Sequence, residues 1–471
     1  MRHPAGDRVG IGIDFGTTNS AAAVFDGQSV RLVGLEEDSP ILPSATYIDR
    51  DLRTQTGRQA IDSYVGDNTG RTVELIPEVI GEASLALGGD SGGREGPQVL
   101  TRKVYGQPVR DIGLRGRLFR GTKRLLGRRE VRRLMVFDHP FRLVALVTPI
   151  LLRIREAFRE VGEDDPRSGC MGHPVNFEGT GADRNALALS RLGEAYGHAG
   201  FDDTRFFPEP VAAAVGYLHA NPGASGTRIL TVDFGGGTLD LCALERTGDR
   251  AGFRTVATHG IALGGDRIDQ RIFSELLFPL LGKGERWKRR GTGRMIETPF
   301  PFQRYEKLLL NWAVTYMLSQ NRYTAPVLDC IAQDGPARFK FRRLRDLIQQ
   351  NYSYRVFQAI RVLKAELSGA EEAVLDIPEI DVELRVTRKE FETLIADLLA
   401  EFERAVDDTL SRAGLGLPEI DIVLGTGGSS LIPAVRRILD SRFPGRVVEH
   451  DPFTGVASGL AIARYHGLDS T

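Results

Sequence analysis

The sequence predicts an α/β protein in which two similar lobes enclose a cleft. Three observations support this prediction: the length of the chain, an internal duplication, and an alternation of strand-like with helix-like segments. The 471 residues exceed the roughly 100 to 200 residues of a typical domain. Apolar residues make up 41% of the chain and charged residues 26%, which is typical of a folded globular protein.

The internal duplication pairs residues 9–25 with residues 228–244. The first copy reads VGIGIDFGTTNSAAAVF and the second reads RILTVDFGGGTLDLCAL. Each copy consists of an apolar strand, an aspartate, a turn of Gly and Thr, and a second apolar strand. The copies lie much further apart than the roughly 20 to 50 residues of a solenoid repeat. We therefore expect two lobes built on one plan, lobe I at 1–225 and lobe II at 226–471.

Helical periodicity occupies the chain between the two copies. Apolar residues recur at three- and four-residue steps from about 141 to 158 and again from 185 to 195, which predicts two helices. Pro210 is well placed for the first turn of an alanine-rich helix that ends near His219.

Helical periodicity also follows the second copy. Apolar residues between Phe391 and Leu410 keep three- and four-residue steps, which predicts one long amphipathic helix. Residues 420–424 indicate a buried strand, which runs into the turn GTGGSS at 425–430 and then into another helix. Strands that alternate with helices in this way indicate a mainly α/β architecture.

Two segments interrupt the alternation. Residues 50–115 are rich in Gly, Asp, Ser and Arg, and GGDSGG at 88–93 indicates an exposed loop. Residues 282–354 are basic, aromatic and helix-prone. We interpret both as parts of insertion subdomains, which we expect at about 47–143 in lobe I and at about 265–394 in lobe II.

The composition excludes several classes of function. The 61 basic and 62 acidic residues leave a net charge of -1, so no global field would attract nucleic acid or an anionic membrane. The longest apolar segment, 143–152, is far shorter than the roughly 20 residues of a transmembrane helix. The N-terminus carries no apolar secretory signal, so we expect a cytoplasmic protein. Cys170, Cys242 and Cys330 form no Cys-x-x-Cys pair, and we expect reduced, buried thiols.

The duplicated turns have the composition of phosphate-binding loops. In a tight turn without bulky side chains, consecutive backbone N–H groups converge on an anion, and threonine hydroxyls add donors. A carboxylate at the strand end would repel the phosphate unless a hard cation, usually Mg²⁺ with retained waters, lies between them. Asp14 and Asp233 are therefore candidates for the magnesium side of the site. One such turn is also typical of an ordinary hairpin, and only the matched pair favours a nucleotide held between two lobes.

Two other phosphate-binding classes are excluded by their motifs. The sequence contains no Gly-x-x-x-x-Gly-Lys-Ser/Thr, the signature of P-loop proteins. Asp-Phe-Gly occurs twice, but no His-Arg-Asp catalytic loop accompanies it, as a protein kinase would require.

Five motifs occur in a fixed order along the chain. They are IDFGTTNS at 13–20, EPVAAA at 209–214, VDFGGGTLD at 232–240, LGG at 263–265 and GGSSLIP at 427–433. This series resembles the actin-like ATPases, above all the DnaK-type chaperones of the heat shock protein 70 (Hsp70) family and their short homologues. The resemblance extends from about Val9 to Ala463. It implies a duplicated actin-like ATPase fold, which is ribonuclease H-like, with ATP or ADP and Mg²⁺ in the cleft between two lobes.

The resemblance also implies a role for each matched residue. Asp14 and Asp233 would face the metal, and the catalytic residues would be Lys123, Glu209, Asp233 and Asp240. The nucleotide-binding residues would be Gly16, Thr17, Thr18 and Asn19 in the first loop, Gly235, Gly236, Gly237 and Thr238 in the second loop, and Gly264, Gly265, Lys364, Ser368, Gly427, Gly428 and Ser429 elsewhere.

Three of the catalytic assignments have a plain structural alternative. Lys123 would neutralise charge on the transferred phosphoryl group, but it is one of ten basic residues between 110 and 133, where a solvated basic face is equally expected. Glu209 would lie near the waters of the metal, although a glutamate at a helix start also complements the helix dipole. Asp240 would orient water, or it is simply an acidic residue at a strand end.

The nucleoside end departs from the family pattern. The segment VLKAELS keeps Lys364 and Ser368, but Ala365 and Leu431 stand where the family has two arginines that stack on adenine. Phe453 stands at a position that is usually acidic. Loss of cation–π stacking would cost on the order of 0.5 to 2 kcal/mol per contact. We therefore expect weaker ATP binding, or a base that is held by apolar packing.

The end of the sequence is a second departure. The family continues into a linker and a β-rich peptide-binding domain, whereas this sequence ends at Thr471, and we expect no peptide-holding module. The basic segment 283–294, near Trp287 and Trp312, indicates a solvated surface more than a nucleic-acid site.

These observations favour a cytoplasmic nucleotide switch that binds Mg-ATP and hydrolyses it slowly. Its partners would be the nucleotide and an unidentified protein client or co-chaperone, with no membrane and no nucleic acid. The alternatives are a catalytically weak actin-like scaffold, a small-molecule kinase, and a filament-forming relative of actin.

Overall fold

Two central sheets share one strand order in the computed structural model, which describes residues 9–87, 98–111, 113–163, 166–222, 226–247, 252–290, 294–333, 335–451 and 453–468. The first sheet contains, in spatial order, β13 (Asp203–Pro208), β12 (Ser168–His173), β1 (Gly10–Phe15), β2 (Asn19–Phe25) and β3 (Val30–Leu32), and β4 (Ile41–Pro43) also pairs with β2. The second contains β22 (Val447–Glu449), β21 (Ile422–Thr426), β14 (Arg228–Phe234), β15 (Leu239–Thr247) and β16 (Gly252–Ile261). The two segments that share one sequence pattern therefore lie in two sheets that share one topology.

The duplicated hairpins lie at the centre of these sheets. β1 pairs with β2 antiparallel and with β12 parallel, and β14 pairs in the same way with β15 and β21. Asp14 and Asp233 stand near the ends of β1 and β14, one residue before the last. In the second hairpin, Asp233 lies directly opposite Asp240. The hairpins thus present their turns and their aspartates at equivalent edges of the two sheets.

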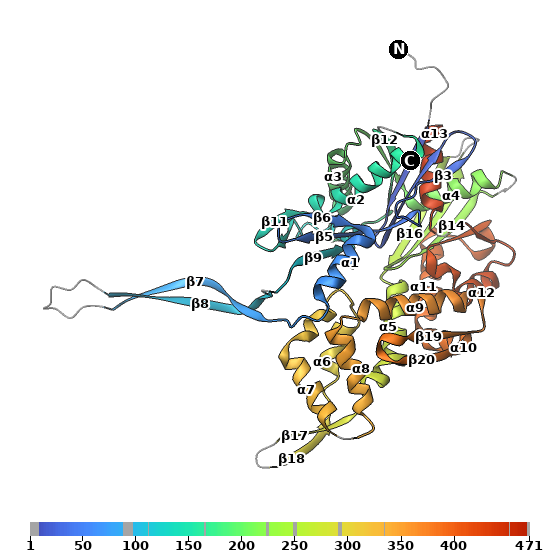
Figure 1. Cartoon of the computed structure of the whole chain (residues 1–471). Coiled ribbons are helices and arrows are strands. Elements are labelled where there is room, and N and C mark those ends of the chain that lie inside the picture. Colours follow the sequence, from blue (N-terminus) through green and yellow to red (C-terminus); the bar gives the residue numbers. More distant parts are fainter. Residues whose placement is uncertain are drawn as a thin grey trace.

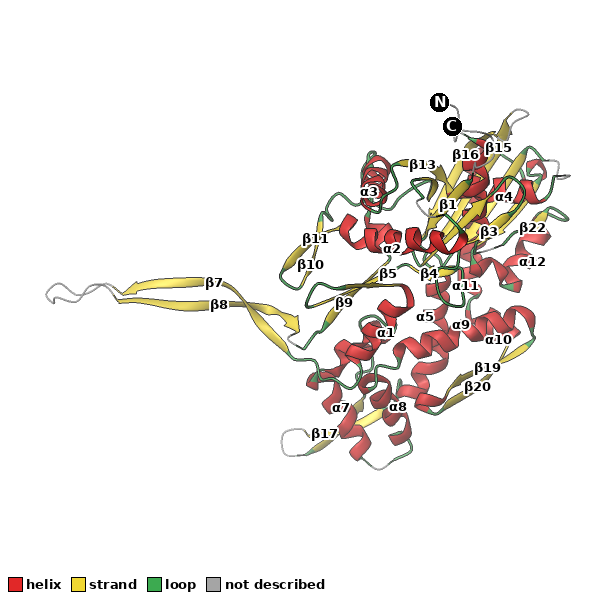
Figure 2. Cartoon of the chain, turned by 45° about the horizontal axis from the view of Figure 1, so that its top comes forward, coloured by secondary structure: helices red, strands yellow, loops and turns green. Residues whose placement is uncertain are grey.

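Helices cover both sheets, and two of them join the lobes (Figures 1 and 2). α2 (Leu143–Ala157) and α3 (Arg184–His198) pack on the first sheet, and α11 (Ala396–Ala413) packs on the second. α4 (Glu209–Ala220) follows the first sheet in sequence but also contacts β14 and β21 of the second. α13 (Gly455–His466) follows the second sheet but packs on β1, β2 and β12 of the first, and against α4. This exchange of helices makes a third core between the sheets.

The helices predicted from periodicity at 141–158, 185–195 and 210–219 are confirmed as α2, α3 and α4. The single helix predicted from Phe391 to Leu410 is wrong, because the chain bends at Ile395 between α10 (Arg388–Leu394) and α11. Ile395 is fully buried, and the apolar residues on both sides of the bend enter the same core. The apolar stripe predicted for one helix is therefore shared by two helices that are separated at Ile395.

The remaining elements of lobe II complete its second layer and its insertion. They are α5 (Gly265–Ile272), β17 (Arg286–Arg290), β18 (Met295–Pro299), α6 (Gln303–Leu309), α7 (Asn321–Ala332), α8 (Arg338–Gln349), α9 (Ser353–Gly369), β19 (Glu372–Ile377), β20 (Val382–Thr387) and α12 (Pro433–Arg442). The segment predicted to be helix-prone is thus largely helical, but it begins with the hairpin of β17 and β18.

The insertion of lobe I has an element that the sequence did not suggest. Its parts are β5 (Ala45–Asp49), β6 (Thr54–Thr56), α1 (Gly57–Asn68), β7 (Leu75–Leu87), β8 (Gln98–Asp111), β9 (Gly116–Arg120), β10 (Arg133–Val136) and β11 (His139–Arg142). β7 and β8 pair as a long antiparallel ribbon that projects away from the rest of the molecule (Figure 1). The loop predicted at 88–93 lies outside the described residues.

The two insertions contact each other at a place that we call the clasp, formed by residues 64–73 of lobe I and by 312–319 and 348–351 of lobe II. The backbone N–H of Gly70 donates to the carbonyl of Gln349 at 2.7 Å. The Tyr64 hydroxyl donates to the carbonyl of Ala313, and its ring meets the Trp312 and Tyr316 rings edge-on, with centroids 6.3 and 6.1 Å away. One apolar core thus extends from lobe II into lobe I.

Two simpler predictions concern cysteines and membranes. Cys170, Cys242 and Cys330 are free and buried, as predicted. Among the described residues, no helix combines the length and apolar character that a bilayer crossing requires.

Candidate nucleotide site between the two lobes

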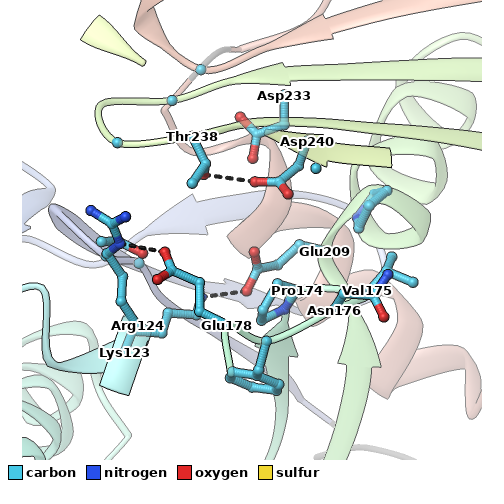
Figure 3. Close-up of a pocket in the computed structure, with 18 of the residues that line it drawn as sticks. Lys123, Arg124, Pro174, Val175, Asn176, Glu178, Glu209, Asp233, Thr238 and Asp240 are labelled. Atoms are coloured by element: carbon cyan, nitrogen blue, oxygen red, sulfur yellow. Dashed lines mark hydrogen bonds and ion pairs between the residues drawn. The ribbon is translucent and has the colours of Figure 1, made fainter. Parts of the chain in front are cut away.

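A cavity of about 890 Å³ lies between the lobes, where the two duplicated turns meet (Figure 3). Most of the residues predicted from the motifs line it: Asp14, Gly16, Thr17, Thr18, Asn19, Lys123, Glu209, Asp233, Gly235, Gly236, Gly237, Thr238, Asp240, Gly427 and Gly428. They come from segments spread over more than 400 positions of the chain, and the fold brings them together.

The two glycine turns face each other across the cavity. A methyl group placed on Gly236 would lie only 2.9 Å from Oγ1 of Thr18, so the second turn approaches the first almost to contact. Within the second turn, the N–H of Gly235 donates to the carbonyl of Thr238 at 3.0 Å. A larger side chain at Gly236 would separate the two turns, which explains the need for glycine at this position.

Four carboxylates and one lysine gather beside the turns. Nζ of Lys123 donates to Oε1 of Glu209 at 2.5 Å, and the Lys123 side chain is only 5% exposed. Oγ1 of Thr238 donates to Oδ2 of Asp240 at 2.7 Å. Oδ1 of Asp14 is buried and has no hydrogen-bond partner. The cluster therefore contains more negative charge than its single lysine can balance.

This imbalance changes the acidity of the aspartates. Burial, with the charge of Glu209, raises the pKa of Asp14 to about 7, although Lys123 opposes the rise. Burial and the charges of Asp240, Glu209 and Asp14 raise the pKa of Asp233 to about 8. Burial raises the pKa of Asp240 to about 6, against the hydrogen bond from Thr238. Carboxyl groups so far from their usual acidity are typical of sites that bind a cation.

Lys123 responds in the opposite direction. Burial favours its neutral form, but the charges of Glu209 and Asp14 outweigh burial, and the pKa of Lys123 is raised. The lysine is therefore a fixed cation inside the cavity, held by Glu209 from the start of α4.

The donor set of the cluster fits a hydrated magnesium ion. Among the described residues, no three His, Cys, Asp or Glu side chains lie close enough to enclose a metal directly. Mg²⁺ usually keeps several waters and takes few protein ligands, so a full protein cage is not required. The unpartnered oxygen of Asp14 and the raised pKa of Asp233 are what such an ion would relieve.

Five predicted residues lie outside the wall of the cavity: Gly264, Gly265, Lys364, Ser368 and Ser429. The N–H of Gly265 donates to the carbonyl of Gly235 at 3.0 Å, and Oγ of Ser429 donates to the same carbonyl at 3.4 Å. Lys364 forms an ion pair with the buried Asp269, and Oγ of Ser368 donates to the carbonyl of Lys364 at 3.0 Å. Around the second turn these residues form a support, and their contact with a nucleotide stays a prediction.

The nucleoside end of the cavity carries an aromatic side chain. Phe453 lines it and is 48% exposed. Its ring lies so near Gly428 that a methyl group there would come within 3.1 Å. Leu431 is 41% exposed, and Ala365 is exposed on α9. The positions of the two absent arginines thus carry exposed apolar side chains, but neither Leu431 nor Ala365 lines the cavity.

Sequence reasoning missed a basic region of the same cavity. Arg124, Arg128, Arg184 and Arg412 line it, with Glu178 among them. Arg124 and Arg128 follow Lys123 within five positions, so the run of basic residues was a usable signal. Glu178 and Arg412 carried no signal, because only the fold brings α11 and the segment after β12 to this edge.

A duplicated two-sheet fold with a charged cleft between paired glycine turns defines the class of the actin-like ATPases. The comparison with protein families gives the particular member of that class. The family model described as "Hsp70 protein" matches residues 180–281 and 335–464. The chain belongs to the Hsp70 family, whose members are nucleotide-binding chaperones that use ATP or ADP with Mg²⁺.

Two curated relatives show how far the similarity extends. The chain is 27% identical over 458 residues to the heat shock 70 kDa protein BIP3 of Oryza sativa subsp. japonica, covering 96% of this chain and 56% of that protein. It is 26% identical over 472 residues to the chaperone protein DnaK 3 of a Synechococcus species, covering 96% and 57%. The chain thus spans a little over half the length of these relatives.

Proposed function

We propose that this protein is a nucleotide switch that binds Mg-ATP between its lobes and hydrolyses it slowly. The single observation that supports this most strongly is the approach of the two glycine turns, Thr18 to Gly236, beside a carboxylate cluster whose negative charge exceeds that of its one lysine. Two turns of backbone amides can hold the phosphate groups of one nucleotide, and the excess of carboxylates can hold its magnesium.

Each group of residues in the cavity would contact a different part of the nucleotide, its metal or the attacking water. The turns at 16–19 and 235–238 would bind the β- and γ-phosphates, and Asp14 and Asp233 would face Mg²⁺ through its waters. The metal, when bound, would neutralise phosphate charge. Lys123 would approach the γ-phosphate, and Glu209 would hold the lysine and orient a water. Asp240, fixed by Thr238, would accept a hydrogen bond from the attacking water.

The nucleoside would be held more weakly than the phosphates. Phe453 offers an aromatic surface at this end, and Ala365 and Leu431 offer no charge to stack on the base. We expect the phosphate groups to dominate affinity, so that ADP and ATP bind far more tightly than adenosine.

The experiment is a thermal-melting series with Mg-ATP, Mg-ADP and Mg-AMP at millimolar concentration. Ligands that bind only the folded protein raise its stability by mass action, and we expect both Mg-ATP and Mg-ADP to raise Tm. Unchanged melting with both nucleotides would sink the proposal. Magnesium dependence would be checked by repeating each curve with EDTA.

A second candidate function is a scaffold that binds nucleotide but no longer turns it over. The two missing adenine arginines favour it, and so does the ion pair with Asp269, which occupies Lys364, a lysine that the resemblance assigned to nucleotide binding. Single-turnover mixing of saturating protein with radiolabelled ATP separates the two. Cleavage no faster than in buffer would favour the scaffold, and either function leaves a client or co-chaperone to be identified.

A further inference from the structure

The cavity has a second end that the proposed nucleotide does not need. Gly427 and Gly428 follow β21, whereas Thr258 to Ile261 lie on β16. β21 and β16 stand on opposite sides of β14 in the second sheet, with β15 between β14 and β16. The cavity therefore passes from the nucleoside end, across the carboxylates, to the far edge of the sheet.

Arginines gather at this far end, and we call the group the arginine port: Arg124, Arg128, Arg184, Arg412 and the carboxylate of Glu178. Arg124 belongs to the short 3₁₀ turn Thr122–Leu125 with Lys123. Its Nη1 lies 3.8 Å from the place where a methyl group on Gly237 would stand. The port is thus adjacent to the turn proposed to hold the γ-phosphate.

Glu178 occupies the donors of two of these arginines. Nη2 of Arg128 donates to Oε2 of Glu178 at 2.9 Å, and Nε of Arg124 donates to Oε1 (Figure 3). The three side chains are 39%, 40% and 30% exposed for Arg124, Arg128 and Glu178. Pairs this exposed are weak and exchangeable, and guanidinium groups match phosphate oxygens as well as carboxylate oxygens.

A hydrogen bond between the lobes joins two residues that line the cavity with the port arginines. Nδ2 of Asn176, after β12, donates to Oγ1 of Thr258 on β16 at 2.9 Å. Oδ1 of Asn176 accepts from Nη2 of Arg184 at 3.3 Å, and Nη1 of Arg412 donates to the carbonyl of Thr258 at 3.4 Å. Both partners of the bridge are therefore held by port arginines.

We propose that the arginine port binds inorganic phosphate on its way out of the cleft, while ADP still fills the other end. Phosphate would replace the Glu178 carboxylate on Arg124 and Arg128, and the Asn176–Thr258 bridge would then have to part for it to leave. The inference rests on the proposed nucleotide function and adds to it a site and a route for the second product.

The first experiment titrates inorganic phosphate into protein saturated with Mg-ADP and measures the heat of binding. Arg128→Ala should weaken phosphate binding by about 5- to 10-fold, as expected for an exposed charge-assisted contact. Glu178→Gln should strengthen it several-fold, because phosphate would no longer displace a charged group. Arg129→Ala is the matched control, since Arg129 is 71% exposed, pairs with Asp183 and does not line the cavity.

The second experiment measures how fast phosphate leaves. Protein loaded with Mg-ADP and phosphate is mixed in a stopped-flow instrument with a fluorescent phosphate sensor. Asn176→Ala should release phosphate at least about threefold faster than the parent, by opening the bridge, while Arg129→Ala should release it at the parent rate.

The outcomes separate this inference from the function on which it rests. If Mg-ADP does not bind, the proposed function fails and the port fails with it. If Mg-ADP binds, but Arg128→Ala and Glu178→Gln bind phosphate like the parent, only the port is overturned. Equal weakening by Arg128→Ala and Arg129→Ala would also overturn it, because the effect would then be one of general surface charge.

Discussion

Two regions join the same two lobes by opposite physical means. One is the cluster of carboxylates beside the glycine turns, which we call the floor of the cleft, and the other is the clasp. At the floor, Asp14, Asp233, Asp240 and Glu209 crowd around Lys123, and one buried oxygen of Asp14 has no partner. At the clasp, Tyr64, Trp312 and Tyr316 are packed edge to face, with backbone hydrogen bonds across the lobes. The floor carries uncompensated negative charge that a bound cation can balance, whereas most polar groups of the clasp already have partners within the protein.

The floor lowers the stability of the folded protein, and the clasp raises it. Buried carboxylates without a counter-ion destabilise the folded state, and such costs are typical of functional sites. Buried aromatic contacts stabilise it. Arg120 adds to the clasp by lying over the Trp312 ring at 4.6 Å. Neutralising a carboxylate of the floor should therefore stabilise the ligand-free protein, whereas truncating a ring of the clasp should destabilise it.

The largest expected effect on stability is at the clasp. Tyr64→Ala removes a buried ring and should lower the free energy of unfolding by about 3 to 5 kcal/mol, measured by urea denaturation without ligand. Phe339→Ala on α8 of the lobe II insertion is the control, because Phe339 is 64% exposed. Equal losses in the two variants would show that the clasp is not the feature responsible.

Lys123→Ala should have the next largest effect, and on turnover rather than stability. Loss of one group that neutralises developing phosphoryl charge reduces kcat by about 10²- to 10³-fold. We expect the thermal shift with Mg-ADP to change much less, because the lysine would act mainly on the γ-phosphate. Lys283→Ala, at an exposed ion pair with Glu306, provides a matched lysine that should leave turnover unchanged.

The floor should also give the ligand-free protein a distinctive pH dependence. The folded-state pKa values of Asp14 and Asp233 lie near 7 and 8, above the value near 3.9 in unfolded chains. Between these values the folded state binds more protons, so unfolding free energy falls as pH rises from about 5 to 8.5. Asp233→Asn should flatten this fall by up to about 1.4 kcal/mol per pH unit while abolishing the response to Mg-ATP. A ligand-free stability that rises with pH over this range would contradict the prediction.

The smallest expected effect is at Thr238, whose hydroxyl donates to Asp240. Thr238→Val removes a hydrogen bond that lowers the pKa of Asp240, so that pKa should rise further. The cost in stability should be only about 1 kcal/mol. The measurement is the pH profile of single-turnover cleavage, whose acidic limb should move to higher pH, and Thr393→Val on the exposed face of α10 is the control.

The motifs predicted most of the cavity wall because their function depends on local backbone shape. A strand, an aspartate and a glycine turn can be recognised within ten residues, and both copies folded as hairpins with their turns facing one cavity. Lys364 was predicted to contact the nucleoside, but its observed partner is Asp269, which stands one helix away. No local pattern indicates that pairing, since it depends on how α5 packs against α9.

Local sequence patterns specify the duplicated hairpins, the α/β alternation and the charged residue types at the ends of the central strands. These features arise from short-range steric and hydrogen-bonding preferences, which act between neighbours along the chain. Packing of the whole chain is what places α4 and α13 across the two sheets, brings the insertions together at the clasp, and sets Glu178 between two arginines. Those contacts join residues that are distant in sequence, and their energies exist only once the lobes have packed together.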